Sequence, residues 1–230
     1  MSSSVPSISV KWLASEWHLA MQLLNIGAIK FGSFEVVNPK LSPSPVYIDI
    51  RTKDNPKPGP IGKGELEMIA RELFRVADEA CIGFDFVCGV PNAGDPIADV
   101  MWDLYGSAHG FEKLRMKKKE RPRRFYFAEK ITNKRLRQGK DRVLLLDNAI
   151  SAGDTNLKAI EAVESAGYRV SGVAILVDRE QGGFDEIERQ GYKIVCWKTL
   201  SELMRFYFTR GRITSSFLDE VLEYTNTHKV

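Results

Sequence analysis

Cysteine and histidine are scarce in this sequence, and long apolar runs are absent. The 230 residues include three cysteines and three histidines. None of these has the paired spacing of a metal site, and an odd cysteine count without a secretory signal indicates reduced thiols in the cytoplasm. No apolar run approaches the roughly 18–20 residues that a transmembrane helix needs. These absences argue against a disulfide-stapled secreted domain, a His/Cys metal centre and an integral membrane protein.

The composition is otherwise that of a globular protein with an uneven charge distribution. Hydrophobic residues make up 43% and charged residues 27% of the chain, and the net charge is +3. Residues 113–142 hold fourteen Lys/Arg and three Asp/Glu, a net charge of +11, which leaves −8 for the remainder. A local concentration of basic residues indicates a local polyanionic partner.

Hydrophobic periodicity predicts an α/β fold in one domain. Strands and helices alternate from residue 84 to residue 208, which favours a parallel sheet covered by helices. The predicted strands are 84–87, 142–146, 170–177 and 193–197, and the predicted helices between and after them are 95–105, 155–165, 184–190 and 200–207. Further helices are predicted at 10–26 and 64–79. In the C-terminal segment, Phe217, Val221 and Leu222 have helical spacing, which indicates a packed terminal helix.

One segment combines a buried strand with groups suited to a phosphorylated sugar. Four apolar residues, Val143–Leu146, are followed by Asp147 and Asn148, whose side chains can bind vicinal hydroxyls. A predicted loop over 148–154 then leads into a helix, and its small residues let backbone N–H groups approach an anion. Ser151 and Thr155 add hydroxyl donors. A Ser/Gly/Thr loop also occurs in strand–helix units that bind nothing, but the preceding acidic residue makes this one more specific.

The segment Val143–Thr155 resembles the 5-phosphoribosyl 1-pyrophosphate (PRPP) motif of type I phosphoribosyltransferases. Three other segments narrow the resemblance to orotate phosphoribosyltransferases, and together they extend it over about residues 24–208. They are Phe31–Phe34 with Ser44–Arg51, Gly89–Pro91, and Gly172–Gly183 with its Asp-Arg turn. The resemblance implies a type I phosphoribosyltransferase fold, a central parallel sheet flanked by helices. A small hood and an N-terminal helix would occupy about 1–50, the α/β core about 64–208 and a C-terminal helix 209–230.

The resemblance also implies a reaction and its partners. Such an enzyme transfers ribose 5-phosphate from PRPP to orotate, which gives orotidine 5′-monophosphate and pyrophosphate in UMP biosynthesis. Mg²⁺ would be the cofactor, held mainly by substrate oxygens rather than by a protein metal site. A cytoplasmic homodimer is implied, because the mobile loop in this family reaches the neighbouring subunit. We expect neither a membrane nor a nucleic acid as partner.

Residue roles carried over from the family fall into three groups. Asp147 and Asn148 would hold the ribose hydroxyls of PRPP. The rest of the PRPP site would comprise Ser151, Ala152, Gly153, Asp154, Thr155 and Arg115. The catalytic group would be Asp147, Lys117 and Lys119. Arg179, Tyr47 and Lys40 would bind orotate, with the Arg179 guanidinium pairing with the planar carboxylate. An ordinary salt bridge for Arg179 and a core position for Tyr47 are the competing interpretations.

The sequence departs from the family pattern at three places. Asn148 stands where a second acidic residue is usual, which removes a negative charge beside the developing ribose cation. The basic segment 115–124 lacks the usual His and Gly, and Val37–Lys40 replaces a Lys-Ser-Gly turn. Two alternatives therefore stay open. One is transfer to a different base, and the other is a non-catalytic regulator that binds PRPP or, through Arg123–Phe127, nucleic acid.

Overall fold

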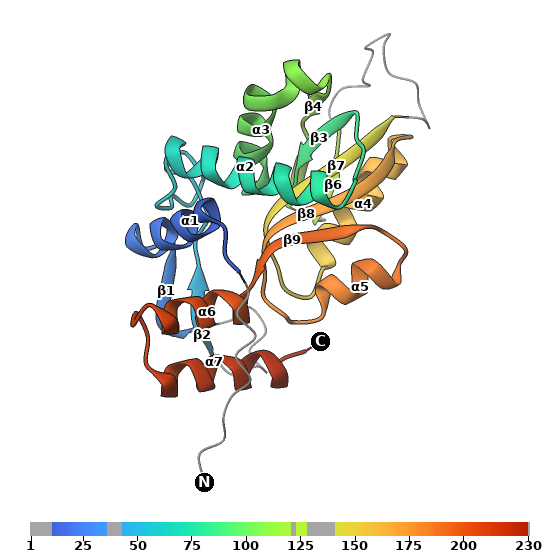
Figure 1. The fold of residues 1–230 in the computed structure, drawn as a ribbon. Coiled ribbons are helices and arrows are strands. Elements are labelled where there is room, and N and C mark those ends of the chain that lie inside the picture. Colours follow the sequence, from blue (N-terminus) through green and yellow to red (C-terminus); the bar gives the residue numbers. More distant parts are fainter. Residues whose placement is uncertain (1–10, 36–42, 121–122, 128–140, 230) are drawn as a thin grey trace.

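The computed structural model describes residues 11–35, 43–120, 123–127 and 141–229. Its centre is a parallel sheet of five strands in the order β4-β3-β7-β8-β9 (Figure 1). These strands are β3 (Phe86–Gly89), β4 (Glu112–Leu114), β7 (Arg142–Ile150), β8 (Arg169–Asp178) and β9 (Ile194–Thr199). The helices that follow them are α3 (Gly94–His109), α4 (Asp154–Ser165), α5 (Gly183–Arg189) and α6 (Leu200–Thr209). The predicted α/β alternation is confirmed.

Alternate residues of β7 point into two different hydrophobic cores, one on each face of the sheet. Leu144 and Leu146 pack into the larger core, with residues of α3 and of α2 (Lys63–Glu79). Val143 and Leu145 point to the other face, where α4 and α5 cover the sheet. A parallel strand buried on both faces needs an apolar residue at every position. The run Val143–Leu146 meets this requirement, since all four side chains are fully buried.

The hood is a separate layer beside the sheet. Strands β1 (Ile29–Phe34) and β2 (Ser44–Ile48) pair antiparallel, and α1 (Ala14–Asn25) precedes them. Helices α6 and α7 (Ser215–Thr227) lie next to this hairpin (Figure 1). Phe31 of β1 contacts both helices, with ring centroids 6.0 Å from Tyr207 and 5.3 Å from Phe217. The hood is therefore built from both ends of the chain.

A buried ion network fastens the hood to the sheet. Glu16 of α1 accepts bonds from Lys198 of β9 at 2.9 Å and from Arg75 of α2 at 2.8 Å. Arg75 also pairs with Glu72 at 2.8 Å. These contacts hold the pKa of Glu16 below its usual range although burial alone would raise it. Breaking one member of such a group leaves an uncompensated buried charge, which is strongly destabilising.

Two sequence predictions about local structure are wrong. Strand β7 does not end at Leu146 but continues to Ile150, because β8 is long enough to pair with Asp147, Ala149 and Ile150. Asn148 is therefore a strand residue rather than a loop residue. The basic segment predicted as a loop contains an antiparallel hairpin, β5 (Lys117–Glu120) and β6 (Arg123–Tyr126). Two buried apolar residues at its base, Met116 and Phe125, join the second core and explain the order there.

The described part of the chain contains no helix long and apolar enough to cross a bilayer.

Candidate active site

Polar residues gather at the carboxyl edge of the sheet, where β3, β7 and β8 end. Ligands bind at this edge in open α/β sheets. Asp147 lies near the end of β7, Asp95 begins α3 beyond β3, and Asp178 ends β8. Arg179 follows directly, and its backbone N–H donates to the Ile150 carbonyl at 3.0 Å. Segments more than 80 residues apart in the sequence therefore meet at one edge.

The predicted phosphate loop has the shape that its sequence requires. It turns at Gly153, whose φ of +86° favours glycine, and α4 begins at Asp154 without a side-chain cap. The turn containing Gly183 packs directly against it: a Cβ atom on Gly183 would lie 2.4 Å from the Ser151 carbonyl oxygen and 2.5 Å from the Gly153 nitrogen. Gly183 also donates its N–H to that carbonyl at 2.7 Å. Two glycine turns, from β7–α4 and β8–α5, therefore shape one loop.

Asp147 is a buried carboxyl with both oxygens engaged. Its Oδ1 accepts from the Asn148 backbone N–H at 2.8 Å, and its Oδ2 accepts from the Asn156 side chain at 2.9 Å. Burial nevertheless raises the pKa of Asp147 to about 7, and the nearby Asp95 carboxyl adds to the rise. Loss of hydration is the dominant cause. A group that neutralises the carboxylate or donates hydrogen bonds to it would relieve this cost.

The turn beyond β3 brings a second acidic residue to the site. A Cβ atom on Gly94 would lie 2.2 Å from the Leu146 carbonyl oxygen, so only glycine allows this turn to press against β7. Burial raises the pKa of Asp95, the next residue, to about 6, while the Arg115 guanidinium opposes the rise. Arg115, a predicted PRPP residue, is exposed and pairs with Asp99. Asp95 was not among the predicted site residues, although it directly follows the glycine-containing turn after β3, which was the available signal.

Arg179 is enclosed, and no carboxylate among the described residues pairs with it. Its Nη2 donates to the Ser44 hydroxyl at 3.0 Å, and its buried Nε has no partner in this part of the chain. Burial lowers the pKa of Arg179, and the neighbouring Tyr224 and Tyr47 act in the opposite direction. The predicted salt-bridge alternative is therefore absent from the described residues. An enclosed guanidinium with unused donors is suited to an anionic ligand.

Tyr47 lies close enough to Arg179 to influence its pKa, so the structure brings together these two predicted base-site residues. Tyr47 is half-buried, and its hydroxyl accepts from Arg51 at 3.1 Å. Its ring lies 5.4 Å from that of Phe34, in the other strand of the hairpin. Tyr47 is therefore a partly exposed residue of the β1–β2 hairpin rather than a core residue. Lys40, the third predicted base-site residue, lies outside the described residues.

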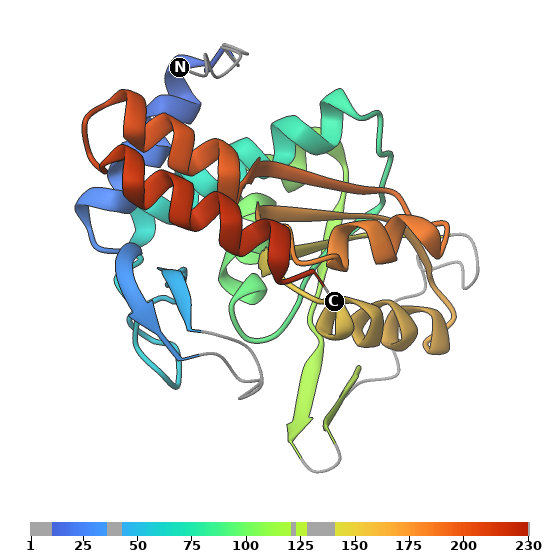
Figure 2. The same ribbon diagram turned by 90° about the horizontal axis from the view of Figure 1, so that it is seen from below.

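The two predicted catalytic lysines are placed differently from Asp147. Lys117 and Lys119 are exposed on β5. Figure 2 shows the β5–β6 hairpin projecting from the body of the molecule. The structure thus separates the predicted catalytic group into a fixed carboxyl at the sheet edge and cations on a projecting hairpin.

The metal ligands available here do not form a closed protein site. Within the described ranges, no group of three or more His, Cys, Asp or Glu side chains could hold a metal ion. Asp147 and Asp95 offer carboxylate oxygens at the site edge, and oxygen is the donor that Mg²⁺ prefers. The residues present therefore suit a Mg²⁺ ion whose ligands come mainly from a bound phosphate and water.

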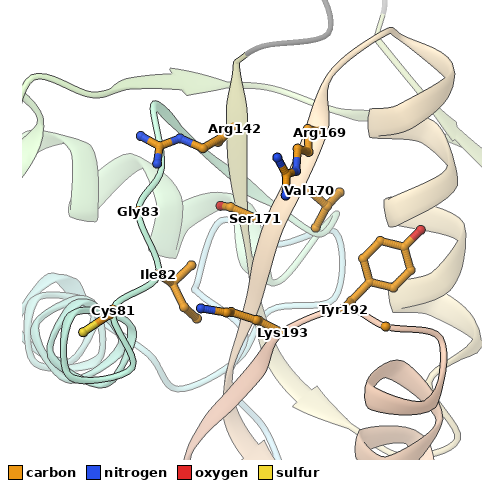
Figure 3. A pocket seen from close by; sticks show the side chains of 10 residues that line it. Cys81, Ile82, Gly83, Arg142, Arg169, Val170, Ser171, Tyr192 and Lys193 are labelled. Carbon is orange, nitrogen blue, oxygen red and sulfur yellow. The ribbon is translucent and has the colours of Figure 1, made fainter.

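A hollow lies at the opposite, amino edge of the sheet (Figure 3). It encloses about 400 Å³, and its charged lining consists of Arg142, Arg169 and Lys193. Arg142 is paired with Asp85 through contacts of 3.0 and 3.1 Å. Because it lies at the starts of β7 and β8, this hollow is separate from the candidate active site.

Comparisons with known proteins agree with this geometry. No model of a protein family matches the chain. It is 32% identical to an orotate phosphoribosyltransferase of Pyrococcus furiosus over 186 residues, which are 80% of this chain and 93% of the relative. It is also 30% identical to the uridine 5′-monophosphate synthase of Bos taurus, over 90% of this chain but 40% of that protein. The structure of Leishmania donovani UMP synthase superposes with a TM-score of 0.71 at 25% identity, over 93% of this chain and 42% of that one.

The five-stranded parallel sheet flanked by helices is that of the type I phosphoribosyltransferase fold. Within that class, the chain belongs to the orotate phosphoribosyltransferase family, a family of glycosyltransferase enzymes. It spans less than half the length of the two UMP synthases that it resembles.

Proposed function

We propose that this chain transfers ribose 5-phosphate from PRPP to orotate, which forms orotidine 5′-monophosphate (OMP) and releases pyrophosphate. The observation that carries the proposal is the half-buried Arg179, which has no carboxylate partner among the described residues, together with the glycine-shaped loop after β7. The loop suits the 5′-phosphate, and the arginine suits a planar carboxylate on the base. A phosphate donor and an anionic acceptor thus have separate places at the same sheet edge.

The phosphate half of the site would hold PRPP in a fixed orientation. Backbone N–H groups of Ser151–Gly153 and the start of α4 would bind the 5′-phosphate. Asp147 and Asn148 would bind the ribose hydroxyls from the adjacent strand end. As the bond to pyrophosphate breaks, positive charge develops on the ribose, and an ionised Asp147 stabilises it electrostatically. Asn148 contributes hydrogen bonds there but no charge.

The base half would orient orotate against that ribose. Arg179 would bind the carboxylate, and the Tyr47 ring would form part of the pocket wall. Mg²⁺, held mainly by phosphate oxygens, would supply charge neutralisation for the departing pyrophosphate when bound. Lys117, Lys119 and Arg115 would add positive charge near the pyrophosphate. In the proposed cytoplasmic homodimer, the β5–β6 hairpin of each subunit would reach the site of the neighbouring subunit.

An assay of orotate consumption tests the function. Loss of orotate absorbance should depend on both PRPP and Mg²⁺, and calorimetry should detect PRPP binding under the same conditions. PRPP binding with turnover of another base but not of orotate would favour the different-base alternative. PRPP binding without any turnover would favour the non-catalytic regulator, for which Asn148 is the motivating residue. Absence of both binding and turnover would overturn the proposal.

A further inference from the structure

The C-terminal helix α7 reaches the base half of the site. Its first turns are fixed in the main core by Leu218 and Val221, and by the contact between Phe217 and Phe31. Its last turn then runs toward the sheet edge, and both ribbon views show the chain end beside α5 (Figures 1 and 2). Burial raises the pKa of Asp178 to about 6, and Lys229 at this end of the chain opposes the rise, so the two groups are within electrostatic reach. The helix is thus packed at one end and available to the site at the other.

Tyr224 on that last turn contacts the segment that carries Arg179. The Tyr224 side chain is buried, and its hydroxyl accepts a hydrogen bond from the Gln181 side chain at 3.2 Å. Gln181 is also buried and lies two residues after Arg179. Tyr224 is close enough to Arg179 to raise the pKa of the guanidinium, against the lowering caused by burial. Tyr224 therefore bonds Gln181 and lies within electrostatic reach of Arg179, and both residues belong to the Arg179–Gly183 turn.

Two side-chain bonds tie the Arg179–Gly183 turn to distant segments near the proposed base half. Arg179 donates to Ser44 of β2, and Gln181 donates to Tyr224 of α7. Glu180, between them, has a φ of +58° and accepts from the Ser201 backbone at 2.7 Å, on the α6 side. Gly183 closes the turn on its phosphate side. Tyr224 and Gly183 therefore hold the turn through different residues, Gln181 in one case and the Ser151 carbonyl in the other.

We propose that Tyr224 is a positioning residue for the base: by holding Gln181, two residues after Arg179, it keeps the guanidinium aimed at an anionic base. This inference rests on the proposed function, since it refines how that site recognises orotate. It assigns a role to the C-terminal helix, whose contribution to the site is not evident from its sequence. A hydroxyl lost here loosens the base half but leaves the phosphate loop, which is held by Gly183, in place.

The test is Tyr224→Phe, which removes the hydroxyl and keeps the buried ring. We expect the KM for orotate to rise roughly fivefold, as for one lost neutral hydrogen bond, with kcat and the KM for PRPP changed less than about twofold. Gln181→Leu should give the same split, and the double variant should be no worse than the stronger single one, because both remove the same contact. A general loss of packing would instead lower kcat and both affinities together.

The matched control is Tyr192→Phe. This tyrosine also uses its hydroxyl for one side-chain bond, to Glu164 at 3.0 Å, but it lies at the amino edge of the sheet (Figure 3). Its substitution should leave both KM values unchanged. An unchanged orotate KM in Tyr224→Phe, with an active wild-type enzyme, overturns this inference alone. A wild-type protein that fails to consume orotate overturns the proposed function instead, so the two failures are distinguishable.

Discussion

Each edge of the central sheet carries an arginine, but the two side chains differ in exposure and in ionic partner. At the amino edge, Arg142 is exposed and makes a two-pronged contact with Asp85. At the carboxyl edge, Arg179 is enclosed and bonds a serine hydroxyl, with no carboxylate partner in the described chain. Exposed ion pairs contribute little to stability, and enclosed unpaired charges cost free energy. Under the proposed function, the orotate carboxylate would supply the missing partner of Arg179.

The acidic groups show the same contrast. Asp85 is satisfied by Arg142, whereas burial raises the pKa of Asp147 to about 7 and that of Asp95 to about 6. Groups with pKa values displaced by desolvation concentrate at functional sites. The carboxyl edge is therefore pre-arranged for charged ligands at the expense of stability, and the amino edge is a stable surface.

Replacing each of the two arginines by glutamine should give the largest difference between the two edges. Arg179→Gln should reduce kcat/KM for orotate by roughly 100-fold, because a charge-assisted contact with the carboxylate is lost. Its melting temperature should be unchanged or higher, since a half-buried charge without a carboxylate partner among the described residues is removed. Arg142→Gln should leave kcat/KM within about twofold of wild type, because its ion pair is exposed. Steady-state kinetics and thermal unfolding measure both; equal activity losses in the two variants would contradict the assignment.

The glycine contact between the two turns should matter next. Gly183→Ala forces a Cβ atom to within 2.4 Å of the Ser151 carbonyl oxygen, so the phosphate loop must shift. We expect PRPP to bind roughly tenfold more weakly, measured by calorimetry, as several backbone donors lose their aim. Gly64→Ala is the control, because its Cβ would meet no atom within 4 Å and alanine favours a helix. Unchanged PRPP affinity in Gly183→Ala would show that this loop does not hold the phosphate.

The raised pKa of Asp147 predicts a specific pH dependence of stability. Burial raises the pKa of this carboxyl from 3.8 to about 7 on folding, so the folded state binds its proton more tightly. The stabilisation is complete below the unfolded pKa and is lost as pH rises through the folded one. Relative to Asp147→Asn, the ligand-free wild type should lose stability between about pH 4 and 7 and then level off. A stability difference that is constant over this window would contradict the shift.

The smallest expected effect concerns Asn148. Asn148→Asp restores a second carboxylate beside the developing ribose cation, and turnover should rise about threefold if this charge limits the reaction. The measurement is kcat at saturating substrates, with PRPP affinity as the control. A lower kcat would show that the amide is the better partner for this site.

The fold around the proposed phosphate half could be predicted from local sequence, whereas the contacts of the proposed base half could not. Val143–Thr155 carries its strand, acidic residue and loop in one continuous segment, so its pattern is visible without tertiary structure. The end of β7 was misplaced because pairing with β8, rather than local propensity, extends that strand to Ile150. The β5–β6 hairpin was not predicted because basic residues surround its two buried residues, Met116 and Phe125, in the sequence.

The base half depends on residues that are far apart in the chain. Ser44 meets Arg179 across 135 positions, and Gln181 meets Tyr224 across 43. Neither Ser44 nor Tyr224 stands in a pattern that distinguishes it from a neighbouring core residue. Arg179 was found through its Asp-Arg turn and the family resemblance, but its lack of a carboxylate partner is a tertiary fact. Contacts between residues so far apart in the chain could not be predicted from the sequence alone.

The most direct test of the two-part site is a comparison of OMP with uridine 5′-monophosphate (UMP), which lacks only the carboxylate on the base. Calorimetric titration of both nucleotides into the wild type and Arg179→Gln measures the phosphate and base halves together. We predict that the wild type binds OMP at least about tenfold more tightly than UMP, and that Arg179→Gln binds the two equally. Equal affinities in the wild type, or an unchanged preference in Arg179→Gln, would contradict the assignment of Arg179 to the base.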